Sequence, residues 1–222
     1  VTVEFSPTDI KLSTTTMNFV NKNTQNLIGE IVPDYAAHKD LIYSSSDKNI
    51  ATVDQNGVVT PIGNGSCVIT VSSYANLVKK TCNVTVKFKA TSVTLSNSSL
   101  TFNNKNTQKL TVAVGPDYAA DKSVTWTSSN TAVATVKDGV VTPVGNGNCV
   151  ITVKTNDGSN ISKTCNVTVN FKVTSITLSD SSLKINNKNT QKLTVTVGPD
   201  YAANKSVTWT SSNTAVATVK DG

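Results

Sequence analysis

Few residues in the chain have side chains suited to catalysis. His38 is the only histidine, and the corresponding positions 83 and 166 residues further along hold Asp121 and Asn204. An imidazole base needs a nucleophile within hydrogen-bond reach, and the sequence around His38 offers none. The carboxylates are spread one or two to a loop, a pattern that favours neither an acid–base pair nor a calcium cage. We therefore predict that the protein is not an enzyme and uses no catalytic residue, metal or cofactor.

Two glycine-rich segments invite comparison with a phosphate-binding loop. They are Gly63-Asn64-Gly65 and Gly145-Asn146-Gly147. No helical pattern follows either one, and the Gly-Lys-Ser/Thr triplet of that loop is missing. We interpret both segments as tight turns that lead into the next strand.

The four cysteines occur as two pairs, Cys67 with Cys82 and Cys149 with Cys165. The hairpin signal Asn156-Asp157-Gly158 lies between the second pair and predicts that Cys149 stands directly opposite Cys165. Directly opposed residues have Cα atoms roughly 4.5–5.5 Å apart, which a disulfide can span. Two disulfides are therefore predicted, and buried thiols acting as small apolar side chains are the alternative. A metal site would need further ligands that the sequence does not supply.

The best candidate for ligand contact is a loop that occurs three times as Pro-Asp-Tyr-Ala-Ala. Its tyrosine can stack on a sugar ring, and its aspartate can accept hydrogen bonds from hydroxyl groups. The alternative is a structural turn, in which proline fixes φ and tyrosine covers the end of the core. The candidate residues are Asp34, Tyr35, Asp117, Tyr118, Asp200 and Tyr201.

These residues recur because the chain repeats itself every 83 residues. Residues 91–139 reappear as 174–222 with six differences over 49 positions, and a more diverged copy precedes them. A unit of this length is too long for a solenoid repeat and suits a small domain. We predict the last strand of a preceding repeat at 1–7, repeat 1 at 8–90, repeat 2 at 91–173 and an incomplete repeat 3 at 174–222.

The incomplete third copy predicts that the chain is an excerpt of a longer array. The alternative is strand sharing, in which Val1–Phe5 completes a neighbouring molecule. Cys165–Phe171 runs into the next copy without a Gly, Pro or Ser linker. Tandem domains joined in this way are expected to form a semi-rigid rod.

Apolar and polar residues alternate along most of the chain, with turn residues every 8–12 positions. Alternation of this kind is typical of half-buried strands in a β-sandwich. We predict an all-β protein made of tandem immunoglobulin-like Greek-key sandwiches. Strands in the second copy are expected at 92–96, 99–103, 107–114, 123–128, 132–137, 140–143, 148–154 and 161–171.

The basic residues are all lysine, and the net charge is +6. Recognition of nucleic acid is not expected without arginine forks or aromatic platforms, and no membrane insertion is expected. Lysines on outward strand positions discourage edge-to-edge pairing of neighbouring copies. Net positive charge also favours contact with anionic wall polymers.

Several ordered motifs resemble the group 2 bacterial immunoglobulin-like domain. They include Val124-Thr125-Trp126-Thr127-Ser128, Ala134-Thr135-Val136 and Gly147-Asn148-Cys149-Val150-Ile151-Thr152-Val153. The first copy departs from the pattern by having Tyr43 at the tryptophan position. Such domains occur in surface adhesins of the intimin and invasin type and in phage structural proteins. The resemblance implies spacer or adhesive modules and brings no catalytic residues.

Three functional hypotheses follow from the repeats and this resemblance. The first is a structural or adhesive stalk of a bacterial cell-surface or secreted protein, whose receptor or glycan is bound by other parts of the parent protein. The second is a module that binds glycan or matrix directly and gains strength by avidity. The third is a phage fibre or decoration protein, or a filament subunit, which includes self-association between repeats.

Overall fold

The computed structural model describes residues 4–222, so part of the predicted strand Val1–Phe5 lies outside the described residues, and Glu4 and Phe5 are not in a strand. The structure is built almost entirely of β-strands, which confirms the predicted all-β class. The chain divides into two compact units. The first unit joins Val1–Val93 to two later segments, Val114–Val124 and Thr155–Ile161. The second unit consists of Thr94–Ala113, Thr125–Lys154 and Ser162–Gly222.

The segment from Asp9 to Val86 contains nine strands, which form three sheets, and one short helix. A four-stranded sheet has the order β2 (Thr16–Phe19), β9 (Lys79–Val86), β8 (Gly65–Ser73) and β5 (Leu41–Ser45). A three-stranded sheet has the order β3 (Gln25–Asn26), β7 (Val58–Pro61) and β6 (Ala51–Val53). The remaining elements are the pair β1 (Asp9–Leu12) and β4 (Gly29–Val32), and the 3-10 helix η1 (Tyr74–Asn76).

The same strand orders return further along the chain. The second four-stranded sheet runs β11 (Ser99–Phe102), β18 (Ser162–Val169), β17 (Gly147–Thr155) and β14 (Val124–Ser128). The second three-stranded sheet runs β12 (Gln108–Lys109), β16 (Val140–Pro143) and β15 (Ala134–Lys137). The pairs β10 (Ser92–Leu95) with β13 (Val112–Gly115) and β19 (Ser175–Leu178) with β20 (Val195–Gly198) correspond to β1 and β4.

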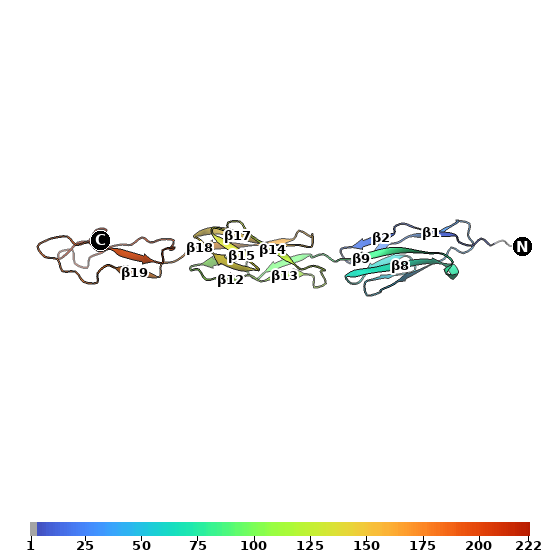
Figure 1. Ribbon diagram of the computed structural model, residues 1–222, viewed down its shortest axis with the longest axis horizontal. Helices are drawn as coiled ribbons and strands as arrows, with labels where there is room; N and C mark the ends of the chain where they lie inside the picture. Colours follow the sequence, from blue (N-terminus) through green and yellow to red (C-terminus); the bar gives the residue numbers. More distant parts are fainter. Residues whose placement is uncertain (1–3) are drawn as a thin grey trace. The chain divides into compact units, whose positions relative to one another are not determined.

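Two apolar cores lie between these sheets because every second side chain of a strand points inward. Cys67, Ile69 and Val71 on β8 are all buried, whereas Val68 and Thr70 between them are half-buried. β8 pairs antiparallel with β9 (Figure 1), and β9 pairs parallel with β2 on its other side. The second core repeats the arrangement around Ile151 and Val167.

The predicted strand 107–114 is wrong in one respect, since the structure divides it into β12 and β13. β12 pairs with β16 in the three-stranded sheet, whereas β13 pairs with β10. Between them, Leu110 is buried and its N–H donates to the carbonyl of Gly139 at 2.8 Å. The alternation continues through the break, which is why the sequence reads as a single strand.

A tight turn before β16 explains the Asp-Gly pair at 138 and 139. Both residues have positive φ, 51° for Asp138 and 80° for Gly139. A two-residue hairpin loop of this kind requires left-handed backbone at both positions. A Cβ at Gly139 would lie 2.4 Å from the Leu110 carbonyl oxygen, so only glycine fits there.

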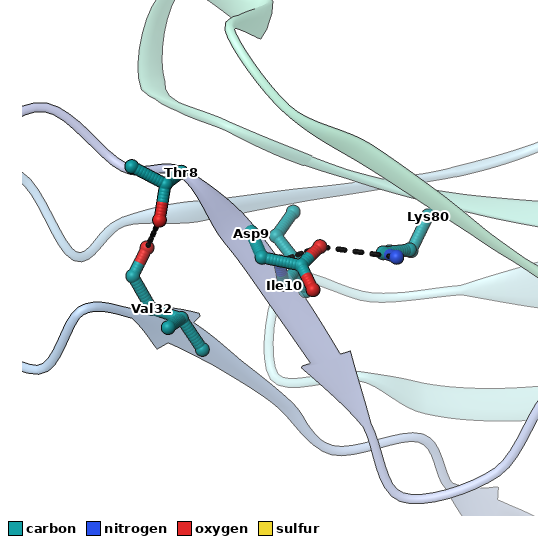
Figure 2. Close-up of polar contacts among 5 residues, drawn as sticks. All are labelled: Thr8, Asp9, Ile10, Val32 and Lys80. Atoms are coloured by element: carbon teal, nitrogen blue, oxygen red, sulfur yellow. Dashed lines mark hydrogen bonds and ion pairs between the residues drawn. The ribbon is translucent and has the colours of Figure 1, made fainter.

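An ion pair fixes the edge sheet β1–β4 to the neighbouring β9. Figure 2 shows Asp9 facing Lys80, with 3.0 Å between the carboxylate oxygen and Nζ, and Thr8 donating to the Val32 carbonyl at 3.2 Å. The hydrogen bond from Lys80, with a second from the Ile10 N–H, lowers the pKa of Asp9.

Two of the three aromatic residues at the repeated tryptophan position contact a core. Tyr43 is buried, and its hydroxyl accepts a hydrogen bond from the Gly29 N–H at 3.2 Å. Trp126 is half-buried against the second core. Trp209 instead lines an open cavity of about 620 Å³ with Ile176 and Leu178, whose side chains are largely exposed.

The expected direct opposition of the cysteines is wrong. In the hairpin of β17 and β18, Cys149 pairs with Val167, and Cys165 pairs with Ile151. The loop is centred on Gly158 rather than on Asp157, because Lys154 pairs with Ser162. Moving the centre by one residue moves every partner by two, which leaves the cysteines diagonal to each other. The first hairpin has the same diagonal arrangement.

Diagonal neighbours on one face have Cα atoms about 7–8 Å apart, beyond the usual range of a disulfide. All four cysteines are buried free thiols in the structure. Burial, and then the neighbouring Cys67 thiol, raises the pKa of Cys82; burial and Cys149 do the same for Cys165. Such thiols react slowly while the fold is intact.

Thiol titration tests the disulfide prediction directly. The chain is denatured without reductant and reacted with an excess of a chromogenic thiol reagent. From the diagonal register we expect all four cysteines to react after unfolding, and to react far more slowly in the folded chain because they are buried. An absence of reactive thiols until reductant is added would establish both disulfides instead.

Candidate functional site

The repeated Pro-Asp-Tyr-Ala-Ala loop lies against the end of the preceding sequence copy. In each occurrence the N–H of the second alanine donates to a phenylalanine carbonyl at 2.8–2.9 Å. The pairs are Ala37 with Phe5, Ala120 with Phe88 and Ala203 with Phe171. The peptide bond before each of the three prolines is cis. We call the two contacts that include Phe88 and Phe171 the first and second joint. Each joint lies wholly inside one compact unit.

Each joint centres on a buried phenylalanine and a half-exposed tyrosine. Phe88 and Phe171 are each 1% exposed, whereas Tyr118 is 45% and Tyr201 39% exposed. The two rings of a pair meet edge to face, with centroids 5.2 Å apart in the first joint and 4.9 Å in the second. Such a pair contributes about 0.5–1.5 kcal/mol beyond the area that it buries.

The asparagine of each Gly-Asn-Gly turn binds both sides of its joint. Asn64 Oδ1 accepts the Phe88 N–H at 2.8 Å, and its Nδ2 donates to the Tyr118 carbonyl at 2.7 Å. Asn146 does the same with Phe171 at 2.8 Å and Tyr201 at 3.0 Å. The segments are therefore turns, as predicted, and their asparagines additionally connect one copy to the next.

A lysine from the preceding copy covers each joint tyrosine. Lys22 Nζ lies 4.3 Å from the Tyr118 ring centroid, and Lys105 Nζ lies 4.4 Å from that of Tyr201. A cation over an exposed ring contributes about 0.5–1 kcal/mol. With roughly 1 kcal/mol for each hydrogen bond, the whole joint is worth on the order of 3–5 kcal/mol. A contact of this strength is expected to be open in a minor fraction of molecules.

In the first joint, Asp157 and Gly158 clamp the segment that connects the two copies. Asp157 Oδ2 accepts the Ala90 N–H at 2.5 Å, and Lys89 Nζ donates to the Gly158 carbonyl at 3.4 Å. Partial burial raises the pKa of Asp157, but hydrogen bonds from Ser159 and Ala90 outweigh it and lower the pKa to about 2. The carboxylate is thus charged at neutral pH and holds the connecting segment.

The predicted ligand-contact residues occupy three different environments. Tyr118 and Tyr201 belong to the joints, where lysine covers their rings. Asp117 and Asp200 point outward to Lys122 and Lys205 at 3.5 Å and 3.8 Å. Tyr35 contacts Phe5 edge to face with centroids 5.1 Å apart and is 65% exposed. Asp34, beside it, is exposed.

Two groups of functional residues were missed by the sequence analysis. Asn64 and Asn146 were interpreted as turn residues, and Asp157 only as part of a hairpin signal. The recurrence of the asparagine 82 residues further along, which is the 83-residue period less the one extra residue of the first copy, was an available signal. His38 stacks on Tyr74 with centroids 4.5 Å apart.

Within residues 4–222, no three His, Cys, Asp or Glu side chains gather in a way that could hold a metal ion. In the same part of the chain, no helix is long and apolar enough to cross a membrane.

The fold and the joints define a class of protein: immunoglobulin-like β-sandwiches connected in tandem by a recurring contact. The model of the bacterial Ig-like domain (group 2) matches residues 89–167 and 172–222, and that of the intimin immunoglobulin-like domain matches residues 39–75. The chain belongs to the group 2 bacterial Ig-like family, which confirms the resemblance seen in its motifs.

Curated relatives of the chain come from bacteria and a phage. A protein of Clostridium acetobutylicum is 36% identical over 165 residues, which are 73% of this chain and 17% of that protein. The Ig-like virion protein of Serratia phage KSP90 is 36% identical over 146 residues, 63% of this chain and 56% of that protein. The chain therefore spans less than two thirds of either relative.

A solved fragment of intimin, in complex with the intimin-binding domain of its translocated receptor, is 18% identical. The match covers 80% of this chain and 68% of the intimin fragment, with a TM-score of 0.36.

The Asp157 clamp predicts a pH-dependent contribution to stability. Asp157→Asn is expected to lower the free energy of unfolding by about 1 kcal/mol near pH 7, a value reduced because the carboxylate is partly exposed. Since the pKa of Asp157 is lowered on folding, its contribution is complete above about pH 4 and is lost as the pH falls toward 2. Urea unfolding of the unmodified chain and the variant, at pH 7 and at pH 2, measures this difference in the free energy of unfolding.

Asp117→Asn is the matched control, because it removes the same charge from an exposed ion pair. It should change the free energy of unfolding little at either pH. Equal losses for the two variants, or a loss for Asp157→Asn that persists at low pH, would contradict the assignment.

Proposed function

We propose that the chain is a non-catalytic structural repeat region that serves as a spacer in a bacterial cell-surface or secreted protein. The observation that carries this proposal is the joint. The motifs that recur most faithfully supply inter-copy contacts: Asn64 and Asn146, and the tyrosines they bind. A repeat whose constant residues hold its neighbour is suited to set length and stiffness.

The spacer proposal includes the copy boundaries and shape expected from the sequence. Repeats 8–90 and 91–173 and the partial repeat 174–222 would each supply one side of a joint. The parent protein would then bind its receptor or glycan through other parts, outside the cell. Family membership and the bacterial relative support this interpretation.

Small-angle X-ray scattering of the full chain tests whether the joints set its shape. Asn64→Ala combined with Tyr118→Ala removes the side chains that close the first joint. We expect the variant to have a broader distribution of interatomic distances than the unmodified chain. Asn83→Ala combined with Tyr74→Ala, which changes the same residue types outside the joint, should leave the distribution unaltered. An unmodified chain as flexible as the joint variant would contradict the proposal.

The second candidate function is direct glycan binding, with Tyr35 as the residue that would contact the sugar. This tyrosine is 65% exposed and contacts Phe5 edge to face, and a tyrosine ring face can stack on a sugar. Under the spacer proposal we expect no binding on a glycan array up to about 1 mM ligand. Binding that is lost in Tyr35→Ala and kept in Tyr118→Ala would favour the glycan module.

A virion component is the third candidate, favoured by similarity to the phage Ig-like virion protein. The same joints would then space subunits of a fibre or decoration protein. Detection of the parent polypeptide in purified virions, or on bacterial cells, separates this candidate from the first.

A further inference from the structure

The chain contains three Asn-Gly dipeptides, and they lie in two different environments. They are Asn56-Gly57 in the turn before β7, and Asn64-Gly65 and Asn146-Gly147 in the joints. Asparagine before glycine is prone to deamidation because glycine has no Cβ to shield its backbone nitrogen. That nitrogen attacks the side-chain amide carbon and loses its proton, a C–N bond forms, and ammonia leaves. Water then opens the cyclic imide to aspartate or isoaspartate.

A closed joint holds the reacting amide away from this reaction. Both polar atoms of the Asn64 side chain are engaged, Oδ1 with the Phe88 N–H at 2.8 Å and Nδ2 with the Tyr118 carbonyl at 2.7 Å. The amide carbon can turn toward the Gly65 nitrogen only after these hydrogen bonds break. Asn146 is held in the same way by Phe171 and Tyr201.

Asn56 provides the unprotected comparison within the same chain. Its side chain is exposed, as are those of Asn64 and Asn146, but among residues 4–222 it makes no side-chain hydrogen bond. Its backbone N–H donates to Asp54 Oδ1 at 2.9 Å, which leaves the side-chain amide free to turn. The attacking nitrogen belongs to Gly57, whose N–H donates to the Asp54 carbonyl at 3.1 Å, so one turn hydrogen bond must break before attack. The three Asn-Gly dipeptides therefore differ in whether the asparagine side chain is held by hydrogen bonds.

We propose that Asn64 and Asn146 are deamidation sites that the joints gate: a closed joint protects its asparagine, and an open joint exposes it to irreversible conversion. The product cannot restore the contact. A carboxylate has no N–H to donate, so its second oxygen would face the Tyr118 carbonyl oxygen across the 2.7 Å that the amide hydrogen bond now spans. Each conversion also adds one negative charge at the joint.

The modification would thus fix a transiently open joint in the open state. Isoaspartate adds a further obstacle, because it inserts a methylene into the backbone directly before Gly65, whose φ is 145°. An array whose joints had been held open, for example by tension, would retain deamidated residues at those joints. This inference depends on the joint and is independent of the parent protein that carries the repeats.

Peptide mass mapping of the full chain, incubated in mildly alkaline buffer, tests the gating. Deamidation is read as a mass increase of about 1 Da in the peptide that carries each asparagine. In the folded chain we expect Asn64 and Asn146 to convert at least about tenfold more slowly than Asn56, which corresponds to about 1.4 kcal/mol. In urea all three rates should converge. Equal rates in the folded chain, or no conversion of Asn64 in urea, would overturn the proposal.

Tyr118→Ala and Tyr201→Ala form a reciprocal pair of variants. Each removes one ring and leaves the carbonyl that its asparagine binds. Tyr118→Ala should accelerate conversion of Asn64 and leave Asn146 unchanged, and Tyr201→Ala should do the reverse. Acceleration of both sites by either variant would indicate general unfolding and contradict gating by the joint.

The product itself is tested with Asn64→Asp and Asn146→Asp. Asn64→Asp should increase cleavage after Lys89 by a lysine-specific protease, with cleavage after Lys172 unchanged, and Asn146→Asp should show the opposite preference. Unchanged cleavage in both variants would show that the product does not open the joint. These measurements do not depend on whether the array acts as a spacer.

Discussion

The side-chain amide of one asparagine in each Gly-Asn-Gly turn determines how successive copies connect. Asn64 satisfies the backbone N–H of Phe88 and the backbone carbonyl of Tyr118 with a single planar group. Only an amide offers a donor and an acceptor in this geometry without charge. The phenylalanine residue of the joint is buried, whereas the asparagine is exposed, so the polar bridge lies at the solvent-facing rim of a small apolar contact.

This arrangement explains why the repeats are so similar in sequence. The middle copy supplies Asn146, Lys105 and Phe171 to the second joint and the loop of Tyr118 to the first. A change in any of these residues would weaken a contact with a neighbour as well as the copy that contains it. Residues outside the joints are less constrained, and His38, Asp121 and Asn204 differ at one equivalent position beside the tyrosine loop.

The joints also connect stability with mechanical behaviour. Each is made of an edge-to-face ring pair, a cation over a ring and a few hydrogen bonds, which together are weaker than a sandwich core. We therefore expect the joints to open before the cores unfold. The Asp157 clamp strengthens the first joint, since it binds the backbone of the connecting segment.

The sequence by itself determined the repeat, the all-β class, the family and the inward direction of the cysteines, because alternation and period are local properties of a strand. It predicted the Pro-Asp-Tyr-Ala-Ala loop as a candidate site but left open whether the tyrosine was structural. Only the tertiary structure assigned the partners of Asn64 and Asp157, which lie 54 and 67 residues away along the chain. The hairpin register was likewise decided by the loop that closes around Gly158. Contacts of this range depend on how strands and turns meet in space, and no local pattern encodes that.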